Sequence, residues 1–330
     1  NDEPERVDSI EQEPFDSIAY YDSVYDNGLS HIEYMIDSLR AIGQFNGAYL
    51  IAKGDYILAE EYLGYANFSS YDTITPETRF QVASITKPFT CLAILLLAQQ
   101  GKIDFTANVK TYLPDFPYNG ITLEMLMSHT SGLGEYIFFM DKIWEDQNVP
   151  LTNDSLYRWM VKNQPAVFRP PNTKHEYNNL GFAILATIVE RVSGQTFPSF
   201  LQENVYQPAG MDKTYIWMEG QENEGPYATG YAANMGDPGN DFLNGVYGDK
   251  GTFSTVRDLH AFSRAFFSQQ LLTDDSLFTT MQEPHCAIKE DSTTYGLGWR
   301  IIYPDDEQKI IHHTGWWDGY RSNLVYYPDM

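Results

Sequence analysis

Cysteine is scarce in this sequence, which contains only two, Cys91 and Cys286. Two cysteines so far apart form neither a disulfide framework nor a cysteine cluster for a metal ion. Cys91 lies inside an apolar segment, where a free thiol is typically a small buried apolar residue. We therefore expect a fold that depends on its hydrophobic core, with no metal site and no cofactor.

Basic residues are also few. The chain has 21 lysines and arginines against 45 aspartates and glutamates, which gives a formal net charge of −24. Nucleic acids and anionic lipid surfaces bind proteins mainly through positive charge. We therefore expect no nucleic-acid partner and no binding to an anionic membrane surface.

Long hydrophobic runs are missing as well. The longest apolar run, Ile94 to Ala98 with its neighbours, is far shorter than the ~20 residues that span a bilayer. The first residues, Asn1 to Glu5, are acidic and lack the basic start and apolar centre of a signal peptide. The sequence predicts no membrane span, and either a cytosolic protein or one whose signal was removed before residue 1.

The composition is that of a folded protein. Hydrophobic residues make up 43% and aromatic residues 15% of 330 residues, which is enough for a substantial core. Residues 1–28 are acidic with little periodicity and predict an N-terminal arm. The apolar spacing from Ser30 to Gly43 predicts an amphipathic helix, and residues 47–62 predict a β-hairpin around Lys53-Gly54-Asp55.

The secondary-structure pattern changes twice along the chain. Residues 29–105 and 245–330 have the pattern of an α/β sheet domain, whereas residues 106–244 predict a helical lobe with loops rich in Pro, Gly and Asn. Three predicted strands would complete the sheet that begins near residue 47: 295–302, 309–314 and 320–327. We expect an α+β fold in which helices flank an antiparallel sheet, with an inserted all-helical lobe and a cleft between the lobes.

Within this frame, helices are predicted at residues 121–127, 178–193 and 255–268. The last of these opens with Thr255-Val256-Arg257-Asp258, the pattern of a capping box.

The segment from Phe80 to Lys87 leads into an apolar run, Pro88 to Leu97, that predicts a buried helix. Ser84 would lie at its first turn, with Lys87 one turn along on the same face. A serine hydroxyl becomes a nucleophile when an adjacent base takes its proton, and burial near the positive end of a helix favours a neutral lysine. Ser84 and Lys87 are therefore a candidate nucleophile and base. The alternative is a serine N-cap followed by a solvated lysine, because Ser-x-x-Lys is a short pattern.

Two further motifs follow Ser84-Ile85-Thr86-Lys87, namely Tyr177-Asn178-Asn179 and His313-Thr314-Gly315. Tyr-x-Asn also occurs at Tyr25 and Tyr65, but only Tyr177 stands between the other two motifs. In this order the motifs resemble the signatures of the serine β-lactamase and penicillin-binding protein superfamily. The similarity is greatest to the branch of class C β-lactamases, D-Ala-D-Ala carboxypeptidases, D-aminopeptidases and related esterases, and covers residues 45 to 330.

The resemblance implies a role for each residue of the first two motifs. Ser84 would be acylated, Lys87 and Tyr177 would transfer protons, and Asn179 would hydrogen-bond the lysine or the substrate. A tyrosine beside an ammonium group can serve as a base, because the positive charge lowers the pKa of the phenol. The structural alternative for Tyr177 is an aromatic residue that caps the following helix.

The third motif is implied to line the substrate cleft. His313 stands where the family has lysine or histidine, and a neutral imidazole there would capture a substrate carboxylate more weakly. Thr314 offers a hydroxyl, and Gly315 would let a substrate backbone approach the strand. The backbone N–H groups of Ser84 and Trp316 would form the oxyanion hole. His312 would point to the opposite face of the strand.

The sequence departs from the family pattern at three points. It has no Glu-x-x-Leu-Asn run, so the class A route of water activation by glutamate has no candidate. Trp316 and Trp317 are bulky where some carboxypeptidases carry a small hydroxyl residue, which leaves the substrate open. The family continues with a last strand and a C-terminal helix, so the resemblance implies that the chain stops short of the family's end at Met330.

Two functional hypotheses follow. The first is a serine hydrolase that forms an acyl-enzyme at Ser84 on D-amino-acid peptides, β-lactams or small esters. The second is a penicillin-recognising binding protein or sensor of cell-wall fragments that acylates slowly or never turns over. Either implies a periplasmic or extracytoplasmic location and a small-molecule or peptide partner. A metal hydrolase using His129, His175 and His313 lacks ligand-type spacing.

Overall fold

A computed structural model describes residues 45–218, 220, 225–232, 241–288, 293–304 and 309–328, together with positions 34, 37, 38 and 41. The predicted N-terminal arm, residues 1–28, lies outside the described residues, as does most of the helix predicted from Ser30 to Gly43.

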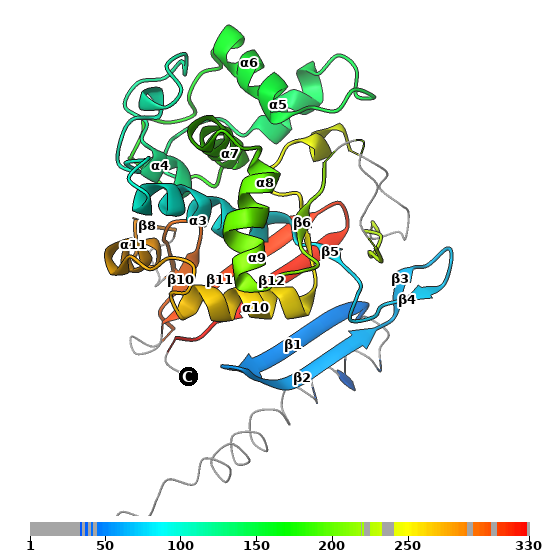
Figure 1. The fold of residues 1–330 in the computed structure, drawn as a ribbon. Helices are drawn as coiled ribbons and strands as arrows, with labels where there is room; N and C mark the ends of the chain where they lie inside the picture. Colours follow the sequence, from blue (N-terminus) through cyan, green and yellow to red (C-terminus); the bar gives the residue numbers. More distant parts are fainter. Residues whose placement is uncertain are drawn as a thin grey trace, which may run out of the picture.

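Antiparallel sheets and helices make up the described chain, which confirms the α+β class (Figure 1). The largest sheet has five strands in the order β12-β11-β10-β9-β8. These strands are β8 Cys286–Ala287, β9 Thr293–Tyr295, β10 Arg300–Ile302, β11 Ile310–Trp317 and β12 Tyr320–Tyr326. A three-stranded sheet joins β5 Phe80–Gln81, β7 Thr252–Ser254 and β6 Tyr215–Ile216, and β3 Tyr65–Asn67 pairs with β4 Asp72–Thr73.

The predicted hairpin is confirmed as β1 Gly47–Lys53 and β2 Tyr56–Leu63. It does not extend the five-stranded sheet, which corrects the prediction, because among the described strands β1 and β2 pair only with each other. β1 packs against α10, Val256–Phe267, and Figure 1 shows the hairpin below that helix. An alternating pattern predicts a strand but leaves its partner open, because every residue other than proline offers the same backbone donor and acceptor.

The single strand predicted at residues 295–302 is in fact two, β9 and β10, which is a second correction. The segment from Gly296 to Trp299 turns the chain back on itself, and the N–H of Gly296 donates to the carbonyl of Trp299. Gly298 has φ +79°, and a Cβ there would lie 2.8 Å from the sulfur of Cys91. The two glycines therefore allow a tight turn against the core helix. The sequence pattern of residues 295–302 did not distinguish this turn from one continuous strand.

The helices predicted at 121–127, 178–193 and 255–268 are confirmed as α4 Leu123–Met127, α7 Asn179–Ser193 and α10. The other described helices are α3 Thr86–Gln99, α5 Tyr136–Ile143, α6 Asn153–Asn163, α8 Phe197–Leu201, α9 Gln207–Ala209 and α11 Asp275–Met281. Short 3₁₀ turns occur at Ala83–Ile85, Val109–Thr111 and Phe242–Gly245, and a π turn at Gln202–Tyr206.

Only half of the capping box predicted at α10 forms. The hydroxyl of Thr255 accepts the N–H of Asp258 at 3.1 Å. The carboxylate of Asp258 instead accepts hydrogen bonds from the N–H of Lys213 and the hydroxyl of Thr214, at 2.8 and 2.7 Å. Asp258 therefore ties α10 to the chain before β6 rather than closing the cap.

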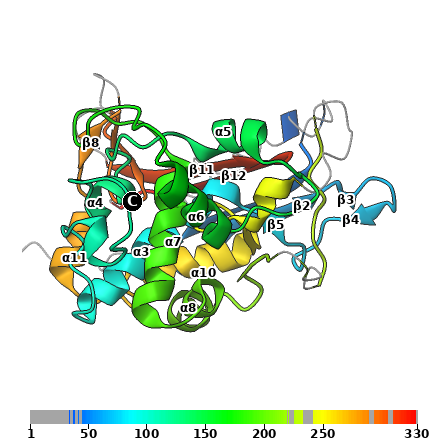
Figure 2. The same ribbon diagram turned by 90° about the horizontal axis from the view of Figure 1, so that it is seen from above.

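Helix α3 is the centre of the core. Every residue from Thr86 to Leu97 is buried, as the apolar run predicts, and Gly101 with φ +70° follows its end. Seen from above in Figure 2, α7 crosses over α3, and the two helices are in contact. This packing fixes the start of α3, and with it Ser84 and Lys87, against the start of α7.

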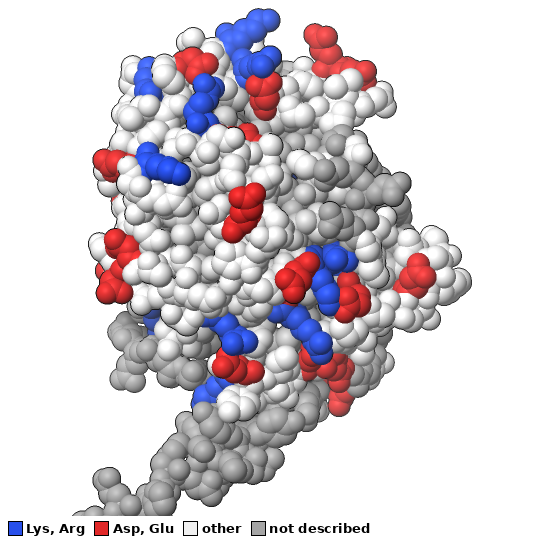
Figure 3. Space-filling model, in the orientation of Figure 1, with Lys and Arg blue, Asp and Glu red and all other residues white. Residues whose placement is uncertain are grey.

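The charges of the described surface are mixed. On the face drawn in Figure 3, basic side chains lie among acidic ones and form no continuous basic patch. None of the described helices has both the length and the hydrophobicity that a membrane span needs.

Candidate active site

Ser84 lies in a strained turn at the entrance to α3. It is the middle residue of the 3₁₀ turn Ala83–Ile85, which follows β5 and leads directly into the helix. Ala83 has φ +48°, a left-handed conformation that is unfavourable for residues with a Cβ and that is often found at functional sites. Ser84 lines a pocket of about 830 Å³. The turn therefore presents the hydroxyl at the end of a rigid helix.

The amine of Lys87 is buried and held by three oxygen atoms. Its Nζ lies 3.0 Å from Oγ of Ser84, 2.7 Å from Oδ1 of Asn179 and 2.9 Å from the carbonyl of Asp249. The side chain has no exposed surface, which excludes the alternative of a solvated lysine. The predicted proximity of Ser84, Lys87 and Asn179 is thus found in the structure. The contact with Asp249 was not predicted, because every residue has a backbone carbonyl and the sequence does not indicate which one faces the lysine.

Glu135 orients the side chain of Asn179. Its Oε2 accepts the backbone N–H of Asn179 at 2.8 Å and the side-chain amide N–H at 3.1 Å. The amide oxygen of Asn179 is therefore turned toward Lys87. Burial raises the pKa of Glu135, although the N–H of Asn179 opposes this effect. Glu135 is also the N-cap of α5, which is the one signal in the sequence that could have identified it.

Tyr177 stands two residues before α7 and lines the same pocket as Ser84. The centroid of its ring lies 4.9 Å from Nζ of Lys87 and 5.6 Å from Cζ of Arg300. The ring also packs on that of His129, with centroids 4.2 Å apart. The amine of Lys87 and the guanidinium of Arg300 thus both lie near the ring of Tyr177. That its hydroxyl transfers protons stays a prediction.

His313 is buried behind the pocket wall. Its Nδ1–H donates to the carbonyl of Thr314 at 2.8 Å, and its Nε2 accepts the hydroxyl of Tyr295 at 3.0 Å. Tyr295 in turn accepts from Nε2 of His129 at 3.1 Å, and Nδ1 of His129 accepts the N–H of Asn178 at 3.0 Å. Burial holds the pKa of both histidines well below the usual range. His313 therefore braces the motif before α7, and its ring does not face the pocket.

The residues that follow His313 divide between the two faces of β11. Thr314 and Trp316 are exposed and line the pocket, as predicted. Gly315 faces the other way, and a Cβ there would lie 2.1 Å from the carbonyl oxygen of Val82. The glycine was expected to admit a substrate. In the structure it admits the turn that carries Ser84, so that β11 and Ser84 border the same pocket.

Arg300 is a pocket residue that the sequence reasoning missed. It lies on β10 and lines the pocket beside Tyr177 and Thr314. Its Nε is buried and has no hydrogen-bond partner among the described residues. Weak capture of a substrate carboxylate was expected from a neutral His313, whereas in the structure Arg300 brings a guanidinium to this wall of the pocket. The sequence pattern placed Arg300 inside one continuous strand, because the turn before it was not recognised. It therefore did not indicate that Arg300 lines the pocket.

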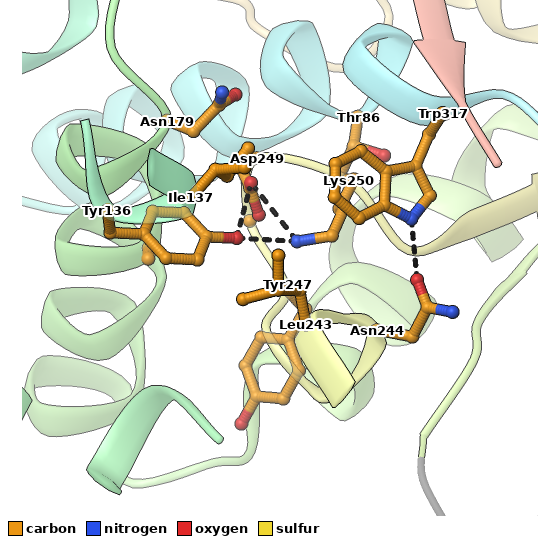
Figure 4. A network of polar contacts seen from close by, with 12 residues as sticks. Thr86, Tyr136, Ile137, Asn179, Leu243, Asn244, Tyr247, Asp249, Lys250 and Trp317 are labelled. Atoms are coloured by element: carbon orange, nitrogen blue, oxygen red, sulfur yellow. Dashed lines mark hydrogen bonds and ion pairs between the residues drawn. The ribbon is translucent and has the colours of Figure 1, made fainter. Parts of the chain in front are cut away.

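Asp249 and Lys250 form a buried ion pair that also lines the pocket (Figure 4). Oδ2 of Asp249 lies 3.3 Å from Nζ of Lys250, and the hydroxyl of Tyr136 contacts both groups, at 2.9 and 2.5 Å. Nζ of Lys250 lies 4.7 Å from the ring centroid of Trp317, whose indole N–H donates to Asn244. Burial lowers the pKa of Lys250, against the opposing effect of Asp249.

The family model described as Beta-lactamase matches residues 32–330. The chain belongs to this family. The superfamily inferred from the three motifs is therefore confirmed, and the protein is a serine hydrolase of the β-lactamase-related type.

Similar proteins of the family include a penicillin-binding protein of Bacillus subtilis strain 168, which is 29% identical over 92% of this chain and 70% of its own length. The crystal structure of a penicillin-binding protein from Bacillus halodurans has a TM-score of 0.78 at 27% identity and covers 89% of this chain and 90% of that one. A D-amino acid amidase from Ochrobactrum anthropi has a TM-score of 0.70 at 23% identity, with 83% and 79% covered, which shows a shared fold.

Proposed function

We propose that this member of the Beta-lactamase family forms an acyl-enzyme at Ser84. The observation that carries the proposal is the set of partners around Lys87. Two of them, the carbonyl of Asp249 and the amide oxygen of Asn179, can only accept hydrogen bonds, whereas the hydroxyl of Ser84 can also donate. A neutral amine that donates to the two acceptors directs its lone pair at Ser84, which is the arrangement of a general base.

In the proposed reaction, the proton of Ser84 passes to Lys87 while Oγ bonds to the substrate carbonyl carbon. Collapse of the tetrahedral intermediate breaks the bond to the leaving group, which takes a proton by way of Tyr177. Water then adds to the acyl carbon and releases Ser84 with its proton. Each step needs the base and the phenol on the same side of the pocket, where Lys87 and the ring of Tyr177 are in contact.

We assign the oxyanion hole to the backbone N–H groups of Ser84 and Trp316. The assignment is supported by the packing of β11 on the turn before Ser84, since Gly315 lies against the carbonyl of Val82. Two N–H groups in a pocket wall stabilise the developing negative charge, and loss of one typically lowers the rate ~10² to 10³-fold.

Arg300 and Thr314 support a substrate with a carboxylate near the scissile bond. A guanidinium that lines the pocket beside an exposed hydroxyl can bind a carboxylate by charge-assisted hydrogen bonds. We infer that peptides ending in a D-amino acid, and β-lactams, fit better than neutral esters. The names of the related penicillin-binding proteins support the same substrate class.

The test is mass spectrometry of the intact protein after exposure to β-lactams and to an activated D-Ala-D-Ala ester. We expect a covalent adduct on Ser84 in the wild type and none in Ser84→Ala. Sustained turnover in a time course identifies a hydrolase, whereas a single stoichiometric burst identifies a slowly deacylating binding protein. Absence of any adduct on Ser84 with every compound would refute the acyl-enzyme proposal.

A further inference from the structure

The proposed function leaves the buried pair Asp249 and Lys250 without a role, although the pair touches the candidate base. The backbone carbonyl of Asp249 accepts a hydrogen bond from Nζ of Lys87 at 2.9 Å. The side chain of the same residue holds Lys250 and Tyr136. One residue therefore links the two lysines of the pocket, Lys87 through its main-chain carbonyl and Lys250 through its carboxylate. Figure 4 shows the contacts of the carboxylate with Lys250 and Tyr136.

The loop that carries the pair is fixed at both ends. The carbonyl of Gly248 accepts the hydroxyl of Thr90 on α3 at 2.6 Å, and a Cβ on Gly248 would lie 2.5 Å from the carbonyl of Phe182 on α7. After the pair, the carbonyl of Gly251 accepts the N–H of Trp217 at 2.9 Å. Between these points, the side-chain contacts of Asp249 and Lys250 help to set the direction of the carbonyl that faces Lys87.

The pair connects the loop to two further elements of the fold, α5 and β11. Lys250 donates to Tyr136 on α5 and packs against Trp317 on β11. Its side chain is 3% exposed and that of Asp249 is 1% exposed. Removing two charges from water is costly, and an apolar pair of similar size is often as stable. A buried ion pair in contact with the candidate base is therefore better explained by the chemistry of the site than by stability.

We propose that Asp249 and Lys250 are positioning residues for Lys87, which hold its amine through the Asp249 carbonyl and balance the charge around it. The inference rests on the proposed role of Lys87 as the base. The charged and titratable groups that face Lys87 from the surrounding elements are Glu135, Tyr177, Asp249, Lys250, His129, His313, Arg300 and Cys91. Among these, Asp249 and Lys250 form an ion pair whose charges cancel, so removal of one member exposes the charge of the other.

The two single variants should therefore act in opposite directions. Lys250→Met leaves an unpaired carboxylate that favours the ammonium form of Lys87. The acid limb of the pH–rate profile for acylation should therefore move to higher pH by about one unit. Asp249→Asn leaves an unpaired ammonium that disfavours a second positive charge, so the limb should move to lower pH by a similar amount. The double variant should return the limb to its wild-type position but acylate several-fold more slowly.

The experiment measures the rate of acylation of the full chain by an activated ester from pH 5 to 9. Lys213→Met serves as the matched control, because it removes one positive charge from a more exposed ion pair with Glu77, which does not line the pocket, and it should leave the limb in place. Thermal unfolding of each variant shows which are folded. Shifts in the same direction, or no shift, would overturn the inference.

Two further results keep the outcome decisive. If a single variant does not fold, the double variant decides, because a wild-type acylation rate in it contradicts a positioning role. If the proposed function is wrong, the wild type itself forms no adduct that depends on Ser84 at any pH. This result distinguishes failure of the proposed function from failure of the positioning role.

Discussion

Lys87 shows what holds a reactive group in place at the scale of one residue. An amine with no exposed surface and three oxygen partners has little freedom to move. Two of these partners are themselves held in place, Asn179 by its hydrogen bonds to Glu135 and, by our inference, the Asp249 carbonyl by the ion pair with Lys250. Such preorganisation avoids the free-energy cost of arranging the groups during the reaction.

Arg300 should determine how well the enzyme binds a carboxylate. Arg300→Gln keeps a polar side chain but removes the charge, so the KM for a D-Ala-D-Ala peptide should rise about 10 to 100-fold, as for loss of a charge-assisted hydrogen bond worth ~1.5 to 3 kcal/mol. The KM for a neutral ester should change little. Steady-state kinetics with the two substrates measure the difference.

Arg158→Gln is the matched control for Arg300, because Arg158 pairs with Asp154 on the exposed face of α6. Its kinetics should equal those of the wild type. An equal rise in KM for the peptide and the ester in Arg300→Gln would contradict carboxylate recognition.

At the scale of the element, β11 is the strand that joins the site to its support. Thr314 and Trp316 point into the pocket, while His313 and Gly315 point toward Tyr295 and Val82. This follows from the period of two along a strand, by which successive side chains face opposite sides. One strand thus offers groups to a substrate and is locked to the protein at alternate positions.

Gly315→Ala should separate β11 from the turn of Ser84. The new Cβ would lie 2.1 Å from the carbonyl oxygen of Val82, so backbone must move on one side of the contact. We expect the acylation rate to fall about 100-fold, the loss typical of a displaced oxyanion donor. We also expect a lower melting temperature.

Gly47→Ala is the control for Gly315, since a Cβ in β1 would meet only the ring of Phe45 at 3.6 Å. Acylation measured by mass spectrometry and thermal unfolding should both be close to wild type in this variant. A Gly315→Ala protein with wild-type acylation would show that the close packing on Val82 is not needed.

At the scale of the whole molecule, buried histidines connect the site to the stability of the fold. Burial holds the pKa of His129 and His313 well below the ordinary value and lowers that of His175 to about 4. These rings pack around Tyr295, the last residue of β9. These buried histidines therefore add no positive charge to the interior of the site at neutral pH.

Stability should fall as the pH drops below about 6.5. The unfolded chain takes up protons on its histidines near that value, whereas His129 and His313 stay neutral in the folded state. Each therefore lowers the free energy of unfolding by up to about 1.4 kcal/mol per pH unit, until the pH reaches the lowered folded-state pKa. The raised pKa of Glu135 acts in the opposite direction.

Urea unfolding at pH 7.0, 6.0 and 5.5 measures this effect. His175→Phe should reduce the slope, because it removes one titrating ring whose Nε2 has no hydrogen-bond partner among the described residues. A free energy of unfolding that is constant from pH 7.0 to 5.5 would contradict the neutral state of the buried histidines.

The sequence by itself determined the local parts of this protein. The apolar run after Lys87 specifies a buried helix, and a spacing of three residues in a helix places Ser84 and Lys87 on one face. The hairpin at residues 47–62 and the capped start of α7 are equally local. These features depend on contacts between residues that are close in the chain, so a pattern of residue types is sufficient to predict them.

Only the tertiary structure decided which distant groups meet at the site. The carbonyl of Asp249, the carboxylate of Glu135 and the guanidinium of Arg300 reach the pocket from a loop, a helix cap and a short strand. It also turned His313 away from the pocket wall and left β1 and β2 unpaired with the five-stranded sheet. Backbone groups are the same in every residue and long-range packing depends on shape, so neither is encoded in a local pattern.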